Sequence, residues 1–294
     1  MWKLDKNKKV LIIGLGLLGG SYAEALTDLG YHVGALTRSQ SSIDYALEKG
    51  LIAEGTTKVD PEFLGKYDLL VFCLYPKVFL EWIRENQQYI KSGALITDVT
   101  GVKRTVVYPI QSILREDVEF IAAHPMAGRE VYGVQNATKT IFKNANYIVT
   151  PTLKNTQEGI EACEELGRIL GFRSVKTLSP EQHDEMIGFL SQLTHCIAVS
   201  LMVCKESESL VDYTGDSFRD LTRIAKINES MWTELFYMNK DELLLQMELF
   251  EEKFNILKEA IRREDTPLIH EIMKLSTEKR KLFDREKPKD PCDK

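Results

Sequence analysis

The sequence lacks the signatures of several classes of protein. Its five cysteines form no C-x-x-C pair and no cysteine–histidine spacing that binds zinc, which argues against a disulfide framework and a metal site. The formal net charge is −6 and the Lys and Arg residues are scattered, so no basic surface for nucleic acid is expected. No stretch approaches ~20 uninterrupted apolar residues, and the N-terminus has no apolar signal segment. We therefore expect a cytoplasmic protein without a metal, a membrane span or a nucleic-acid partner.

Strand-like and helical patterns alternate in the first part of the chain, whose 294 residues are enough for two domains. The strand-like runs are 10–13, 32–36, 69–74, 94–98, 119–123, 146–150 and 173–177. The helical segments between them include 43–49, 78–90, 105–114 and 156–170. This alternation predicts an α/β domain of the Rossmann type over residues 1–178, with a mostly parallel, doubly wound sheet and helices on both faces.

The first strand runs directly into the glycine pattern Gly14-x-Gly16-x-x-Gly19, and a helical pattern follows. Gly14 permits the tight turn, Gly16 lets the backbone approach a pyrophosphate, and Gly19 lets helix and strand pack closely. Backbone amides at the helix N-terminus then face the anion. This context predicts a dinucleotide site rather than a turn whose glycines serve packing alone. The expected cofactor contacts in this unit are Gly14, Gly16, Leu17, Leu18 and Gly19.

The end of the second strand bears on the choice of cofactor. NAD-binding units usually carry an acidic residue here, but residues 35–42 hold no carboxylate, and Asp44 falls in the next helix. Arg38 can pair with a ribose 2′-phosphate, and Thr37 and Ser39 can donate hydrogen bonds to it. We therefore favour NADP over NAD. The alternative is that Arg38 is a solvated loop residue that stacks on adenine, which fits either cofactor.

Ligands of parallel sheets bind beyond the carboxyl ends of the strands. Three loops are expected there, at residues 74–76, 98–101 and 124–128. Leu74 and Pro76 of the first loop are expected to contact the cofactor. His124 begins the third loop, where it can accept a proton from a substrate hydroxyl while hydride leaves the same carbon. A structural role for this histidine is the alternative.

The pattern changes at Ser179. The run Ser179-Pro180-Glu181-Gln182 is typical of a helix start, and almost everything after it is helical. This predicts an all-α domain over residues 179–294, with a disordered tail at about 284–294. The segment 181–206 is apolar nearly all round and must be buried, which a domain of this size can hardly achieve alone. We expect a homodimer formed through the helical domain.

Polar groups interrupt this apolar helix. Asp184, Ser191 and His195 are separated by seven and four residues, which predicts one common face. Such a stripe must be hydrogen-bonded internally or contact a ligand. Further on, Arg223 suits a substrate carboxylate, and the alternative is an internal ion pair with Asp220.

Seven motifs occur in a characteristic order: G-L-G-L-L-G-G-S (14–21), D-V-T-G-V-K (98–103), H-P-M-A-G-R-E (124–130), H-D (183–184), S-Q-L-T-H (191–195), F-R-D-L-T-R-I-A (218–225) and M-W (231–232). Together they make the chain resemble the prephenate/arogenate dehydrogenase family of tyrosine biosynthesis. The resemblance extends from about residue 10 to residue 280. It implies a nucleotide-binding domain, a helical dimerisation domain and an active site between them.

The resemblance also implies roles for individual residues. His124 would bind the hydroxyl on the ring C4 of the substrate, and Lys103 would lie near cofactor and substrate. The implied substrate-binding residues are Ser191, His195, Arg223 and Trp232. The implied ionic network around Arg223 consists of Glu130, Asp184 and Asp220. Many relatives have a serine where this chain has Gly101, and Thr100 is expected to supply the missing catalytic hydroxyl.

The implied reaction is the NAD(P)-dependent oxidative decarboxylation of prephenate to 4-hydroxyphenylpyruvate. Arogenate, which carries an ammonium in place of the keto group, is the alternative substrate. A reductase of the same architecture that acts on a β-hydroxyacid or an imine would share the glycine pattern and the helical domain. It would not require His124, His195 and Arg223 together. A non-enzymatic NADP(H) sensor would need only the nucleotide site.

Overall fold

The structure is a computed structural model and describes residues 2–129, 131–206 and 208–284. Contacts between Cα atoms divide the chain into two compact units, Met1–Leu243 and Leu244–Lys294. The first unit contains both sheets and most of the helices. The predicted boundary between residues 178 and 179 lies inside this first unit and stays a prediction.

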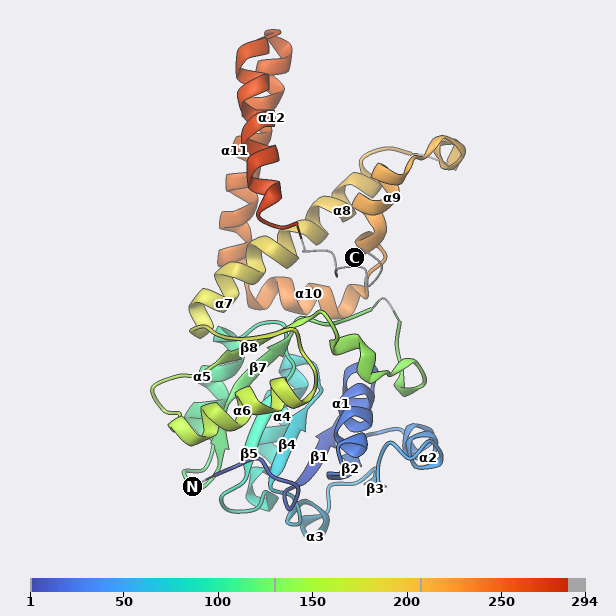
Figure 1. Ribbon diagram of the computed structural model, residues 1–294, viewed down its shortest axis with the longest axis vertical. Helices are drawn as coiled ribbons and strands as arrows, with labels where there is room; N and C mark the ends of the chain where they lie inside the picture. Colours follow the sequence, from blue (N-terminus) through green and yellow to red (C-terminus); the bar gives the residue numbers. More distant parts are fainter. Residues whose placement is uncertain (1, 130, 207, 285–294) are drawn as a thin grey trace, which may run out of the picture. The chain divides into compact units, whose positions relative to one another are not determined.

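The first sheet is parallel throughout and has the strand order β3-β2-β1-β4-β5-β6 (Figure 1). Its strands are β1 (Lys9–Ile13), β2 (His32–Leu36), β3 (Glu54–Thr56), β4 (Leu69–Phe72), β5 (Leu95–Asp98) and β6 (Glu119–Phe120). This order is that of dinucleotide-binding folds, so the predicted Rossmann-type domain is confirmed. Only β3 is unexpected, because its three residues are too few and too polar to show a strand pattern.

Helices cover both faces of this sheet. They are α1 (Leu17–Asp28), α2 (Gln40–Glu48), α3 (Pro61–Leu64), α4 (Pro76–Asn86) and α5 (Arg104–Ile113). Ile12 of β1 belongs to one core with Leu26 of α1, whereas its neighbour Leu11 belongs to another with Phe79 of α4 and Ile110 of α5. Successive side chains of a strand point to opposite faces, so the two cores lie on opposite sides of the sheet.

A second, three-stranded sheet has the order β7-β8-β9. It consists of β7 (Ala122–Pro125), β8 (Asn146–Thr150) and β9 (Ser174–Thr177), and α6 (Gln157–Ile169) packs against β8 and β9. The predicted single strand at 119–123 is wrong. The chain changes sheets at Ile121, so that β6 pairs with β5 and β7 pairs antiparallel with β8. As a result His124 lies within β7 and not in a loop.

After β9 the first unit is mostly helical. It comprises α7 (Pro180–Ile187), the π-helix η4 (Gly188–Leu193), α8 (Thr194–Val203), η5 (Glu208–Tyr213), α9 (Asp216–Thr222), η6 (Arg223–Ala225) and α10 (Glu229–Met238). The predicted helix start at Ser179 is confirmed as a capping box. The Ser179 hydroxyl accepts from the Gln182 amide at 3.2 Å, and the Gln182 side chain accepts from the Ser179 amide at 3.0 Å.

The second unit is a pair of helices. The long helix α11 (Lys240–Arg262) begins in the first unit, and α12 (Thr266–Lys281) follows a tight turn whose Asp265 side chain caps the new helix. The tail predicted to be disordered, 284–294, lies outside the described residues from position 285 onward.

The stretch Pro180–Val203 is long and apolar enough to cross a membrane, with a mean hydropathy of 1.7. Polar residues interrupt it, as expected, but its mean hydropathy still reaches the range of a membrane span. Core helices of soluble proteins reach the same average, so composition alone does not decide. Its Asp184 and Gln192 are buried and hydrogen-bonded to other elements of the first unit.

The capping box allows a test of how much the start of α7 contributes to stability. Replacing Ser179 by Ala removes one acceptor from the first turn and should lower the free energy of unfolding by about 1 kcal/mol. Urea unfolding followed by circular dichroism measures the change. The matched control is Ser276→Ala in the middle of α12, where the residue is exposed and a loss is not expected. An equal loss in both variants would contradict the capping role.

Candidate active site

The glycine turn after β1 has the geometry of a phosphate site. Gly14 has a φ of +98°, and a Cβ there would lie 2.4 Å from the Cys73 carbonyl oxygen. A Cβ on Gly19 would lie 2.0 Å from the Gly14 oxygen, so helix and strand need both glycines. Gly16 is the N-cap of α1, carries no side-chain cap, and would give a Cβ nothing within 4 Å. The N-terminus of α1 therefore lacks a side-chain cap and has open space beside Gly16, which fits a pyrophosphate.

Other residues predicted to contact the cofactor surround this turn. Leu74 lies beside Gly14, since its Cδ2 would be 2.9 Å from a Cβ there, and Pro76 is the buried first residue of α4. After β2, Thr37 is half-buried and Arg38 is exposed. Ser39 caps α2 by accepting from the Ser42 amide at 3.2 Å, so its hydroxyl is partly committed to the helix.

His124 forms one end of a buried chain of hydrogen bonds. Its Nδ1 lies 2.8 Å from Nε2 of His183, and Nδ1 of His183 lies 2.8 Å from Oδ1 of Asp184. His183 and Asp184 are fully buried, and His124 is half-buried. Burial, together with the neighbouring His183 and Lys103, lowers the pKa of His124 well below its ordinary value. Its imidazole is therefore neutral at neutral pH.

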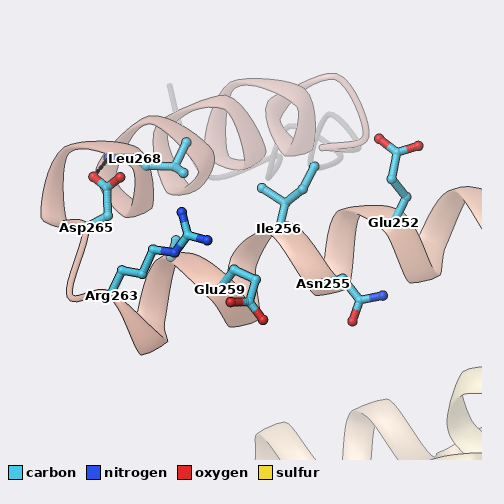
Figure 2. A pocket seen from close by; sticks show the side chains of 8 residues that line it. Glu252, Asn255, Ile256, Glu259, Arg263, Asp265 and Leu268 are labelled. Carbon is cyan, nitrogen blue, oxygen red and sulfur yellow. Dashed lines mark hydrogen bonds between the residues drawn. The ribbon is translucent and has the colours of Figure 1, made fainter.

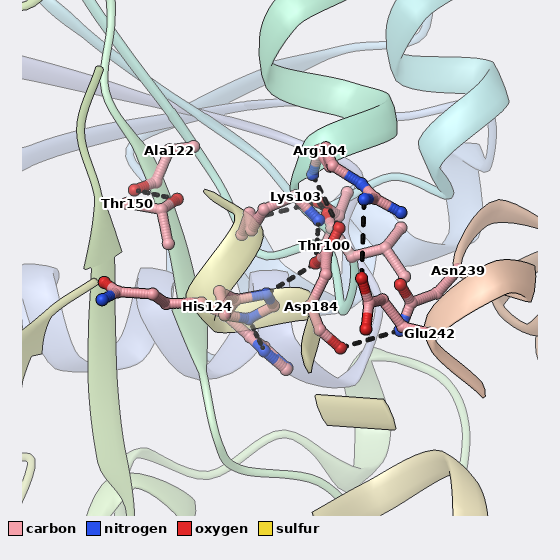
Figure 3. A network of polar contacts seen from close by, with 12 residues as sticks. Thr100, Lys103, Arg104, Ala122, His124, Thr150, Asp184, Asn239 and Glu242 are labelled. Atoms are coloured by element: carbon pink, nitrogen blue, oxygen red, sulfur yellow. Dashed lines mark hydrogen bonds and ion pairs between the residues drawn. The ribbon is translucent and has the colours of Figure 1, made fainter. Parts of the chain in front are cut away.

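Asp184 connects α7 to the N-terminus of α5. Its Oδ1 accepts from the backbone amide of Lys103 and its Oδ2 from that of Arg104, each at 2.8 Å (Figure 3). A carboxylate at a helix N-terminus is stabilised by these amides and by the helix dipole. The oxygens of Asp184 are engaged with these amides and with His183. Its place in an ionic network around Arg223 stays a prediction.

Lys103 is a buried cation that joins the end of β5 to β7. Its ammonium donates to Oδ2 of Asp98 at 2.7 Å, to the Ala123 carbonyl at 2.6 Å and to the Thr100 hydroxyl at 3.2 Å (Figure 3). Oδ1 of Asp98 accepts from the Ala123 amide at 3.0 Å, which fixes the backbone next to His124. Burial lowers the pKa of Lys103, and the Asp98 carboxylate opposes this shift. All three ammonium protons have protein acceptors, so this geometry supports a positioning role.

Gly101, and not Thr100, faces His124. The Thr100 hydroxyl is bonded to the Asp98 carboxylate and to the Val102 carbonyl, so it belongs to the cluster around Lys103. The structure therefore does not support the expectation that Thr100 supplies a hydroxyl to His124. A Cβ on Gly101 would lie 3.8 Å from Nε2 of His124.

Helix α10 closes the site from the helical side. Leu235 would lie 3.7 Å from a Cβ on Gly101, and the Glu234 carboxylate accepts from the Lys77 amide at the start of α4 at 2.9 Å. Buried Asn239 donates to the Asp184 carbonyl at 2.9 Å and to the Gln192 side chain at 2.8 Å. These contacts join α10 to the elements that hold both the cofactor site and Asp184.

The π-helix η4 explains why the predicted polar stripe is not a single face. A wider turn shifts every later side chain by about 100° around the helix axis relative to α-helical spacing. Asp184 lies before this turn and His195 after it, so their side chains have different partners. Nδ1 of His195 donates to the Ser191 carbonyl at 2.8 Å, and its ring packs against Trp232 with centroids 3.7 Å apart and ring planes tilted by 30°.

The other residues implied by the family resemblance lie in the helical part. Arg223 is exposed at the start of η6, and Asp220 is exposed on α9. Ser191 is half-buried in η4. Glu130 lies outside the described residues. The roles of these four residues stay predictions.

Sequence reasoning missed several residues of the buried network. His183 was named only as part of the H-D motif and was given no role, yet it contacts His124 directly. Asp98 was named only as the first residue of the D-V-T-G-V-K motif, and its bond to the Ala123 amide spans 25 positions. Asn239 carried no signal beyond its polarity, and its partners Asp184 and Gln192 lie 55 and 47 positions away. The adjacent H-D pair within an apolar helix was the one available sign of a buried pair.

A separate groove lies between α11 and α12 in the second unit and holds none of the predicted site residues (Figure 2). Charged side chains border it, namely Glu252, Glu259, Arg263 and Asp265. Among the described residues no group of three or more His, Cys, Asp or Glu could hold a metal ion.

Similarity to known proteins agrees with this geometry. The solved prephenate dehydrogenase of A. aeolicus, in complex with hydroxyphenyl propionate and NAD+, superposes with a TM-score of 0.87 at 31% identity, over 94% of this chain and 98% of that chain. The Synechocystis arogenate dehydrogenase shares the fold, with a TM-score of 0.82 at 24% identity over 94% of this chain and 100% of that chain.

Sequence comparison gives the same family. The Bacillus subtilis prephenate dehydrogenase is 31% identical over 87% of this chain and 71% of its own length. The Zymomonas mobilis cyclohexadienyl dehydrogenase is 26% identical over 93% of this chain and 95% of its own length. Family models of the prephenate dehydrogenase nucleotide-binding and dimerization domains match residues 23–176 and 179–275. The chain therefore belongs to the prephenate dehydrogenase family.

Proposed function

We propose that the protein is a prephenate dehydrogenase, which converts prephenate to 4-hydroxyphenylpyruvate by oxidative decarboxylation with a nicotinamide cofactor. The observation that carries this proposal is the neutral His124 in a buried hydrogen-bond chain, beside the edge of the sheet where the glycine turn would hold the cofactor. A relative 31% identical that is named prephenate dehydrogenase supports it.

The reaction requires a base for the C4 hydroxyl and a precise orientation of substrate and nicotinamide. Nε2 of His124 would accept the proton of the C4 hydroxyl while hydride leaves the same carbon. A bound nicotinamide supplies the hydride acceptor. The bond from the ring to its carboxylate then breaks, its electron pair makes the ring aromatic, and CO2 departs. The proton held by His124 returns to the phenolate oxygen. Since aromatisation drives the reaction, positioning is the main task of the protein.

The glycine turn and α1 would hold the pyrophosphate, with Leu17, Leu18, Leu74 and Pro76 around the cofactor. Arg223 would bind a substrate carboxylate in a bidentate fork. The packed rings of His195 and Trp232 would line one side of the substrate pocket, with Ser191 next to them. Lys103 and Thr100 would not contact the substrate. Lys103, bonded to Thr100, would fix the backbone carbonyl of Ala123, the residue before His124.

The preferred cofactor in this proposal is NADP. Exposed Arg38 lies two residues after the end of β2, and residues 37–43 offer no carboxylate that would repel a 2′-phosphate. Thr37 and Ser39 flank it as hydrogen-bond donors.

We also propose a homodimer formed through the helical domain, residues 179–294. In the single chain α8 and the π-helix before it leave apolar side chains uncovered, with Phe189 54% and Val203 77% exposed. A second copy of this domain would bury them. The four described cysteines are free thiols, in keeping with a cytoplasmic location.

Initial rates of nicotinamide reduction test the function directly. Prephenate and arogenate are each assayed with NAD and with NADP. Rapid reduction of NADP with prephenate is the expected result, and faster turnover of arogenate would reassign the substrate. Absence of turnover with all four pairs would contradict a dehydrogenase of this family and favour a nucleotide sensor.

Replacement of His124 by Asn tests the base. The variant should lower kcat by about 10²–10⁴-fold, because asparagine cannot accept the hydroxyl proton. The Kd for NADP, measured by fluorescence titration, should stay within about twofold, because His124 has no part in the nucleotide site. A variant with unchanged kcat would remove His124 from the mechanism.

The pH profile of kcat/KM tests the protonation state. His124 acts as a base only when neutral, and its pKa in the folded protein lies well below the ordinary 6.5. The rate should therefore stay level as the pH falls from neutrality to 6.5 and should decline only at lower pH. A decline centred at or above the ordinary histidine value would contradict the buried, neutral imidazole.

Arg38→Ala tests the choice of cofactor. Loss of a charge-assisted bond to the 2′-phosphate should raise the KM for NADP about tenfold or more and leave the KM for NAD within about twofold. Arg84→Ala, at an exposed arginine near the end of α4, is the matched control. Equal effects on NAD and NADP would indicate that Arg38 stacks on adenine instead.

A further inference from the structure

The chain of hydrogen bonds behind His124 determines where each proton lies. Both oxygens of Asp184 are acceptors, and they already receive the amides of Lys103 and Arg104. The ring nitrogen of His183 that faces Asp184 at 2.8 Å is Nδ1, so Nδ1 must carry a hydrogen. The direction of the first bond is thus dictated by a carboxylate that cannot donate.

The hydrogen on Nδ1 of His183 in turn determines the tautomer of His124. Burial lowers the pKa of His183, and this outweighs the neighbouring Asp184 carboxylate, so the ring is neutral. A neutral imidazole with a hydrogen on Nδ1 has a lone pair on Nε2. That lone pair lies 2.8 Å from Nδ1 of His124, which must therefore be the donor. Neutral His124 then keeps its own lone pair on Nε2.

We infer that His183 is a positioning residue for the dehydrogenation: anchored by Asp184, it holds His124 as the Nδ1–H tautomer and aims the lone pair of Nε2 at the substrate hydroxyl. This inference rests on the proposed function for its consequence in catalysis. When Nε2 takes up the hydroxyl proton, the Nδ1–H bond to His183 strengthens, because a charged donor makes a stronger hydrogen bond. The charged and titratable groups nearest to the pair are Asp184 from α7, Asp98 from β5 and Lys103.

The arrangement also accounts for Gly101. A hydroxyl at this position would stand beside Nε2 of His124, because the Cβ would lie 3.8 Å from that nitrogen. In this chain the ring is oriented instead from its Nδ1 side by His183, so a glycine at 101 leaves Nε2 to the substrate alone.

Three variants test the inference by kinetics. His183→Leu removes the acceptor and should lower kcat about 100-fold, with the KM for prephenate within about threefold. In this variant the acid limb of the kcat/KM profile should move to lower pH. The reason is that the protonated form of His124 loses its hydrogen-bond acceptor, which lowers the pKa of His124 further. His183→Gln restores an acceptor oxygen and should recover at least about tenfold of the lost kcat. The matched control is His32→Leu at the first residue of β2, away from the active site. It removes a contact of 3.2 Å between Nε2 of His32 and Oε1 of Glu54 and should keep wild-type kinetics.

A second measurement separates this inference from the function itself. Nitrogen-15 spectra of the imidazoles, with His124 assigned from the His124→Asn variant, should show Nδ1–H in the wild type and a mixture of tautomers in His183→Leu. An active wild type with unchanged kcat, acid limb and tautomer in His183→Leu would overturn the inference and leave the function standing. If the wild type turns over neither substrate, the function falls, and the spectra alone decide: a fixed Nδ1–H tautomer lost in His183→Leu supports the inference, and an Nε2–H tautomer overturns it.

Discussion

The site depends on the hydrogen bonds that two backbone amides donate to the Asp184 carboxylate. Asp184 accepts from Lys103 and Arg104 at the start of α5, and so joins the first helix of the helical part to the parallel sheet. The same carboxylate receives His183 and, through it, orients His124. Because each bond in the chain has one possible direction, a backbone contact at a helix N-terminus determines which nitrogen of His124 can act as a base.

The surrounding structure protects this contact. The buried ion pair of Lys103 and Asp98 ties the ends of β5 and β7 together. Breaking one partner of such a pair would leave an uncompensated charge in the core. On the other side Asn239, the C-cap of α10, donates to the Asp184 carbonyl and to the side chain of Gln192 in the π-helix. The site is therefore assembled from separate elements, namely β5, β7, α5, α7, η4 and the end of α10, which these polar contacts join.

Features that depend on local sequence could be predicted. The glycine turn needs a positive φ at Gly14 and close approach at Gly19, five positions later, and the Ser179 capping box is closed within three residues. Contacts between distant residues could not be predicted in this way. His183 and His124 are hydrogen-bonded although 59 positions separate them in the sequence, and the residues around His183 give no indication of this partner. The π-helix changed the phase of an apparently regular helix, so that Asp184 and His195 gained different partners.

A crystal structure with oxidised NADP and hydroxyphenyl propionate would test the account most directly, because this ligand carries a hydroxyl where the reacting hydroxyl of prephenate should lie. The account predicts that the hydroxyl lies within hydrogen-bond distance of Nε2 of His124, with the bond from His124 to His183 intact and the pyrophosphate on the first amides of α1. A ligand hydroxyl bound to any other group, or a His124 ring turned away from His183, would contradict it.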